Sequence, residues 1–207
     1  YWNRYWVSMP NIKVVVCGSA ASWMINHLIH GKGGLHNRVT ARVPLSPLTL
    51  QETKQYLKSL HLPYSDKQIL TLYMVMGGIP FYLDILNRSL SVVQNINNLC
   101  FSKKGALIDE FGELYSSLFA DYEAHEELIR LIAQSRRGIE RTALLSKAKL
   151  SSDGGTFNQR IKALEASDFI VSFKPYGFKK RGTYYRIIDE YSLFYLQWIE
   201  PEISSIR

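Results

Sequence analysis

Basic side chains are concentrated in one part of this 207-residue chain, where they could bind phosphate groups. Residues 130–186 contain 13 Lys or Arg and 4 Asp or Glu, a local net charge of +9, whereas the remaining 150 residues sum to −2. A helix is predicted over 156–168, with its apolar positions facing the core. This turns four polar side chains outward or to the flank: Asn158, Gln159, Arg160 and Lys162. Such side chains contact base edges and phosphates when a helix enters the DNA major groove.

A second basic group, formed by Lys179, Lys180 and Arg181, lies at the tip of a predicted β-hairpin. These side chains have no apolar surface to cover, so they could lie along a phosphate backbone. The alternative is a solvated face on a domain that packs within the protein. The sequence favours neither interpretation.

Acidic residues are concentrated in a different segment, residues 109–127, which has no basic residue. Carboxylates in the first turns of helices usually interact with the helix dipole and solubilise the surface. We prefer that interpretation to a metal site or an acid/base pair, although these groups could also dock the basic hairpin tip. The acidic residues are Asp109, Glu110, Glu113, Asp121, Glu123, Glu126 and Glu127.

Other motifs do not provide a catalytic centre. Residues 31–34 (GKGG) are not a phosphate loop, because that loop needs four residues between its glycines and then Lys followed by Ser or Thr. His27, His30 and His36 have a loosely ligand-like spacing but no adjacent carboxylate or thiolate. We predict no metal site, and no Ser-His-Asp, HExxH or CxxC arrangement occurs.

The elements expected to hold these residues are mixed α and β, and mostly α. Residues 13–17 (KVVVC) predict a strand buried on both faces, and residues 39–44 offer a second strand. A helix is expected between them, over 20–30, closed by the glycines at 31–34. This order of strand, helix and strand resembles the remnant of an α/β nucleotide-binding core.

Helices alone are predicted after Pro47, over 49–60, 66–76, 80–87 and 92–101. Thr49 and Ser65 are suitable N-caps, and Pro80 fits the first turn of a helix. Four short helices joined by tight turns predict a small lid-like bundle.

The region beyond residue 106 predicts a winged helix. Three helices are expected, one around Leu128 and the others over 139–150 and 156–168, with Thr156 and Gln159 forming a capping box. The alternating runs 169–175 and 183–189 predict the hairpin. An aromatic segment at 191–201 predicts a buried helix that leads into a following module.

Composition indicates which partners and which cellular compartment suit the chain. The net charge of +7 makes an acidic partner plausible without choosing among nucleic acid, nucleotide and membrane surface. The uncharged stretch 68–83 is too short, and too interrupted by Gly and Pro, to span a bilayer. Two cysteines favour a reducing cytoplasm. Because the chain starts at Tyr1 with an amphipathic run, we expect it to be part of a longer protein.

Five motifs, taken in order, resemble the prokaryotic AAA-like ATPases of the archaeal-type family, which are relatives of the STAND signalling ATPases. The resemblance covers nearly the whole chain. The motifs are VVVCGSAASWM at 14–24, GGLHNRV at 33–39, PLSPLTLQE at 44–52, GGIPFYL at 77–83 and YYRIIDEYSLFY at 184–195.

The resemblance implies roles for particular residues. Ser19 is similar in position to a sensor group near the γ-phosphate, although a turn or N-cap serine is an equally good interpretation. Arg38 is similar in position to an arginine that contacts phosphate charge. Gly78 and Pro80 belong to a turn that resembles the Gly-x-Pro lid motif, in which Pro80 would pack against adenine. A simple N1 proline after a glycine helix stop is the alternative.

The sequence therefore predicts four parts: residues 1–47 as the end of an α/β ATPase core, 48–105 as a helical lid, 106–189 as a winged helix, and 190–207 as the start of another module, which in some family members is nuclease-like. The resemblance implies ATP and magnesium as cofactors of the longer protein. None is expected for this chain alone, because the Walker A and B motifs would precede Tyr1. The winged helix would report the nucleotide state to DNA or to a protein partner, including another copy. The rival functions are a non-catalytic DNA-binding regulator and an interaction module without DNA affinity.

Overall fold

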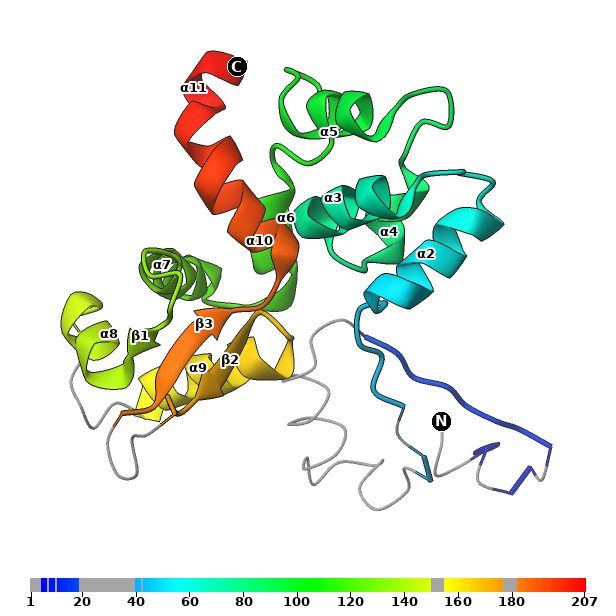
Figure 1. The fold of residues 1–207 in the computed structure, drawn as a ribbon. Coiled ribbons are helices and arrows are strands. Elements are labelled where there is room, and N and C mark those ends of the chain that lie inside the picture. Colours follow the sequence, from blue (N-terminus) through cyan, green and yellow to red (C-terminus); the bar gives the residue numbers. More distant parts are fainter. Residues whose placement is uncertain are drawn as a thin grey trace.

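The computed structural model describes residues 5–6, 8–9, 11–18, 40–41, 43–149, 155–176 and 182–207. This part of the chain is mixed α and β and mostly α, with one three-stranded antiparallel sheet, as the sequence predicts. Figure 1 shows a first group of helices on one side and a helix-and-sheet unit on the other, with the C-terminal helices rising between them.

The first helical unit contains four helices, and three of them begin with a complete capping box. The Thr49, Ser65 and Ser91 side chains each accept a hydrogen bond from the backbone three residues later, and the side chain there bonds back. These reciprocal bonds satisfy N–H groups that a helix start leaves unpaired. The helices are α2 (Leu50–Ser59), α3 (Asp66–Met76), α4 (Pro80–Asp84) and α5 (Val92–Cys100). Each lies where a helix was predicted, although α4 ends three residues earlier than expected.

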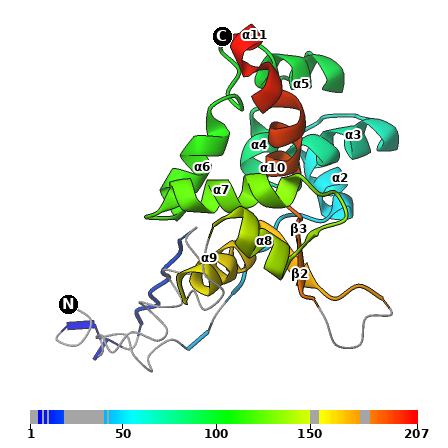
Figure 2. The ribbon, with the colours of Figure 1, turned by 90° about the vertical axis from the view of Figure 1, so that its left-hand side faces the viewer.

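The second unit follows α6 (Glu110–Leu118) and alternates helices with strands. Its elements, which we call the α7–β3 unit, are α7 (Tyr122–Ala133), β1 (Ile139–Glu140), α8 (Arg141–Lys147), α9 (Gly155–Ala166), β2 (Ile170–Phe173) and β3 (Tyr184–Ile187). The strand order is β1-β3-β2, with Ile139 paired to Tyr185 and Ile170 paired to Ile187. In Figure 2 the helices α7, α8 and α9 gather on one side of the strands.

Two local predictions in this unit are wrong. The expected helix over 139–150 begins with a strand, because Ile139 and Glu140 pair with β3 before α8 starts at Arg141. Thr156 is not an N-cap, since α9 already begins at Gly155 and places Thr156 inside its first turn. The core positions of α9 are confirmed: Phe157, Ile161 and Leu164 are all buried.

The C-terminal segment is one helical run with changing geometry. It comprises α10 (Glu190–Phe194), a π-helical turn η3 (Tyr195–Ile199), a 3-10 turn η4 (Glu200–Glu202) and α11 (Ile203–Ile206). Tyr191, Tyr195 and Ile199 are buried, which confirms the predicted buried helix. Helix α10 packs against both α3 and β3, so it joins the two units.

The two units share one hydrophobic core. Buried side chains form a single cluster that runs from Leu57 in α2 to Ile199 in the C-terminal segment. The ring of Phe111 lies parallel to that of Tyr195, with the ring centroids 4.5 Å apart. The ring centroids of Tyr82 in α4 and Tyr191 are 5.2 Å apart. These contacts place aromatic rings from distant parts of the sequence at the junction between the units.

The predicted N-terminal strands are not present among the described residues. Residues 13–17 form no strand and are exposed, with Val15 88% accessible, and the described residues of 39–44 are likewise irregular. A run of β-branched residues becomes a buried strand only when neighbouring strands pair with it, and no described strand lies beside this run. The described residues of 13–17 and 39–44 therefore do not form the two strands expected there, and the helix expected over 20–30 lies outside the described residues.

Candidate functional site

The turn between α3 and α4, residues 77–80 (GGIP), is held by close backbone packing. Gly77 has φ of +61° and ψ of −157°, a conformation that only glycine adopts readily. A Cβ on Gly78 would lie 1.8 Å from the Leu48 carbonyl oxygen, while the Leu48 N–H donates to the Gly78 carbonyl over 2.8 Å. The turn is therefore fixed against the segment that precedes α2.

The two residues after these glycines present apolar surface. Ile79 is the N-cap of α4 and is partly buried, and Pro80 is the exposed first residue of that helix. A proline suits this position because its missing N–H would have no helical partner. Of the two residues that the resemblance singled out here, Gly78 is buried against backbone and Pro80 is accessible.

A cleft of about 230 Å³ lies beside the GGIP turn. Four segments meet there: the loop before α2, the end of α3 with Ile79, the residues around Asp168 after α9, and residues 188–190 at the start of α10. Asp168 comes two residues after α9 and has φ of +58°. The lining residues are Ser46, Pro47, Tyr73, Ile79, Asp168, Ile188, Asp189 and Glu190.

Carboxylates give this cleft a negative character. Asp189 caps α10, with an oxygen that accepts from the Ser192 N–H at 2.6 Å. Burial raises the pKa of Asp189, although its hydrogen bonds with Ser192 act in the opposite direction. Burial also raises the pKa of Glu190, and the neighbouring Asp189 charge adds to that effect. Where these carboxyl groups are ionised, their charge disfavours a phosphate group in the cleft.

Pro47, Tyr73 and Ile79 give the cleft apolar and aromatic surface. In the described ranges we find no group of three or more His, Cys, Asp or Glu side chains able to hold a metal ion. Ser19 and Arg38, which the resemblance assigned to phosphate chemistry, lie outside the described residues.

The polar face of α9 is the second candidate site. Asn158, Gln159 and Lys162 are exposed, as expected for side chains opposite the buried Phe157 and Ile161. Lys179, Lys180 and Arg181 at the hairpin tip lie outside the described residues.

Arg160 differs from its neighbours on α9 because it is engaged within the chain. Its Nε donates to an Asp121 carboxylate oxygen over 2.7 Å. Asp121 precedes α7, and its other oxygen lies 3.2 Å from Nδ1 of the buried His125. Burial lowers the pKa of His125, and the Arg160 charge acts in the same direction. The acidic segment thus contacts the basic face of α9 at one point.

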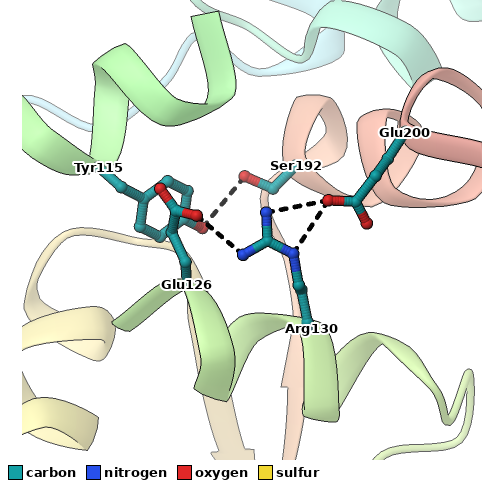
Figure 3. Close-up of polar contacts among 5 residues, drawn as sticks. All are labelled: Tyr115, Glu126, Arg130, Ser192 and Glu200. Carbon is teal, nitrogen blue, oxygen red and sulfur yellow. Dashed lines mark hydrogen bonds and ion pairs between the residues drawn. The ribbon is translucent and has the colours of Figure 1, made fainter. Parts of the chain in front are cut away.

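A polar network connects α6 and α7 to the C-terminal segment (Figure 3). Arg130 donates from Nη1 to Glu126 over 2.8 Å and from Nε to Glu200 over 2.9 Å. Tyr115 and Ser192 exchange a hydrogen bond over 3.2 Å in the buried core. These bonds fix the C-terminal segment on the α7–β3 unit.

Sequence reasoning missed the residues that join the parts of the molecule. The spacing of Glu126 and Arg130, four apart on a helix, is a detectable signal for an ion pair. Glu200 carries no such local signal, because its partner Arg130 lies 70 residues away. Asp189 has a local partner, Ser192, but its place in the cleft, like that of Asp168, depends on how distant segments pack.

Comparisons with known proteins give one structural similarity. No family model matches the chain, and no curated protein matches it. A Walker-type ATPase of Pyrococcus abyssi has a similar fold, with a TM-score of 0.56, 18% sequence identity and coverage of 92% of this chain. The chain spans 54% of that protein. The chain therefore has a fold similar to that of part of this ATPase. Within the described residues, no helix has the length and hydropathy needed to cross a membrane.

Proposed function

We propose that this chain is part of an ATP-binding switch protein related to the AAA and STAND ATPases. In this proposal the GGIP turn holds adenine and the α7–β3 unit, a winged helix, responds to the nucleotide. The observation that carries the proposal is that Ile79 of the turn and Asp168, just beyond α9, line the same cleft. A ligand bound there would contact the end of the helix whose outer face carries Asn158, Gln159 and Lys162.

Three features support the individual assignments. The order α7, β1, α8, α9, β2, β3, with β3 in the centre of the sheet, is typical of a winged helix. The fold similarity to the Walker-type ATPase covers most of the chain. The cleft combines apolar walls with carboxylates, which favours a base over a phosphate.

The remaining chemistry is assigned to other parts of the protein. Ser19 and Arg38 would act on phosphate charge, with magnesium and the phosphates held by residues that the longer protein supplies. Bound ATP would supply a cleavable phosphoanhydride and would bridge those residues to the GGIP turn. Loss of the nucleotide would free the cleft and let the segment around Asp168 relax, which would alter the position of α9.

Nucleotide binding tests the first half of the proposal. In the full-length protein, Pro80→Ala should weaken binding of a fluorescent ATP analogue by about threefold to tenfold, because the resemblance places Pro80 against adenine, next to the cleft-lining Ile79. Pro63→Ala, at an exposed proline in the loop between α2 and α3, is the matched control. Ser19→Ala and Arg38→Ala should lower the hydrolysis rate more than the affinity. Equal affinities for Pro80→Ala and Pro63→Ala would contradict the assignment of the base site.

DNA binding tests the second half. Affinity for a labelled duplex should fall by about a thousandfold between about 50 mM and 200 mM salt if the face makes about six phosphate contacts. Replacing Lys179, Lys180 and Arg181 with Ala should reduce the log-log salt slope by about 3. Changes at Asn158 or Lys162 should alter sequence preference more than the slope.

A protein-interaction module without DNA affinity is the second candidate. The ion pair between Arg160 and Asp121 favours it, since one cation of the α9 face is already neutralised within the chain. No duplex binding at about 50 mM salt, together with intact nucleotide binding, would select this alternative.

A further inference from the structure

A second cleft is formed by α3, the end of α7, β3 and the C-terminal segment. It shares no lining residue with the cleft beside the GGIP turn. It has a volume of about 430 Å³. Its apolar lining residues include Met74, Ile132, Ile187 and Leu193. A cleft of this size is large enough for one or two bulky side chains of a partner.

Two large side chains on its border are unusually accessible. Met74 is 64% exposed and Trp198 is 56% exposed. Leu70, one turn before Met74 on the same face of α3, is 46% exposed and extends the apolar stripe. Tryptophan and methionine are enriched at protein interfaces, and an exposed tryptophan next to an apolar cleft is typical of a binding hot spot.

The local helix geometry contributes to the exposure of Trp198. The residue lies in the π-helical turn Tyr195–Ile199, in which Tyr195 and Ile199 are both buried. Single π-helical turns occur frequently at functional sites because the wider turn redirects side chains. Here the turn keeps two side chains in the core and leaves the indole at the cleft.

The charge around the cleft is of one sign. Arg136 and Arg186 line it, and no lining residue carries a carboxylate. Within the described ranges, neither guanidinium forms an ion pair. Arg186 lies over the Phe173 ring, 5.7 Å from its centroid, which limits its freedom without neutralising its charge.

We propose that this cleft binds an acidic peptide segment of a partner protein, with an apolar side chain of the peptide inserted beside Trp198 and its carboxylates paired with Arg136 and Arg186. The aliphatic floor favours a side-chain anchor over a stacked nucleic-acid base, and the two unpaired guanidinium groups provide charge complementarity to carboxylates. The site needs neither a nucleotide nor DNA, so it is independent of the function proposed above.

A peptide array provides the test. Its members are acidic nonapeptides that carry Leu, Phe or Trp at pairs of positions three or four residues apart. Two matched arrays replace the acids with Gln and Asn, or the anchors with Ala. The full chain should bind members of the first array only, and affinities of the best peptides are then measured by fluorescence polarisation.

Substitutions in the cleft test whether the peptide binds there. Trp198→Ala should lower the affinity for the best acidic peptide about tenfold or more, and Arg136→Ala combined with Arg186→Ala should lower it about fivefold and reduce its salt dependence. Tyr176→Ala is the control for loss of an exposed aromatic ring, and Lys103→Ala with Lys104→Ala is the control for lost charge. Thermal unfolding of each variant verifies that it is folded.

Several results would overturn the proposal. These are no binding to any acidic peptide, equal binding to the neutral array, or equal losses in the cleft and control variants. Tighter binding of oligo-dT than of any acidic peptide would identify a nucleic-acid surface instead. A dimer detected by sedimentation and abolished by Trp198→Ala would identify a second copy of the chain as the occupant.

Discussion

The first helical unit and the α7–β3 unit are stabilised in different ways. Three helices of the first unit start with capping boxes, in which all partners lie within four residues of sequence. In the first unit only α4 lacks a side-chain cap hydrogen bond. In the α7–β3 unit, α7 and α8 have none, and the preceding α6 has none either. They are held instead by the aromatic cluster and by pairs such as Arg130 with Glu200, 70 residues apart. Local bonds thus define where helices begin in one unit, and tertiary contacts do so in the other.

The largest expected effect comes from breaking the tertiary contacts. Phe111→Ala should lower the free energy of unfolding by about 3–5 kcal/mol, since Phe111 is 1% exposed and stacks on Tyr195. Because the two units share one core, urea unfolding followed by circular dichroism and by near-ultraviolet absorption should give one common transition. A first unit that stays folded while the α7–β3 unit unfolds would show that the cores are separate.

An intermediate effect is expected at the GGIP turn, where the first unit itself depends on a distant contact. Gly78→Ala should lower the free energy of unfolding by about 1–3 kcal/mol, because the new Cβ would collide with the Leu48 carbonyl. Gly112→Ala is the matched control: it lies in α6 with nothing within 4 Å of a Cβ. That substitution should stabilise the protein by about 0.5–1 kcal/mol through helix propensity. Similar changes in both variants would argue against the close approach at Gly78.

The smallest effect concerns a single cap. Ser91→Ala should cost about 1 kcal/mol, because the Gln94 N–H would lose its acceptor. Glu140→Ala, at the start of α8, should cost less, since Glu140 makes no cap hydrogen bond. Denaturant midpoints of the two variants measure the difference. A larger loss for Glu140→Ala would reverse the contrast between the two units.

The same contrast explains what could be predicted from the sequence. The α3 boundaries, Asp66 and Met76, are those expected, because the Ser65 cap and the Gly77 stop are local signals. The buried face of α9 was also predictable from its periodicity. Strand β1 was not, because two residues become a strand only through pairing with Tyr184 and Tyr185, 44 to 46 positions away.

The candidate sites were predictable to a lesser degree. The turn containing Gly78 and Pro80 was found from its residues, and the exposed positions of α9 from its period. The contact between Arg160 and Asp121, 39 residues apart, depends on how α7 and α9 cross, which no local pattern records. The run at 13–17 was misread for the same reason, since its apolar composition does not specify a partner strand.

The docking of α10 between the two units also has a consequence for biosynthesis. Helices α2 to α5 leave the ribosome long before Tyr191, Tyr195 and Ile199 are made, yet those side chains complete the core that these helices share. Until then the apolar faces of Leu72, Met76 and Leu83 lack part of their cover. The nascent chain therefore has a period in which chaperone binding or aggregation competes with folding, and that period ends only when residues 190–199 emerge.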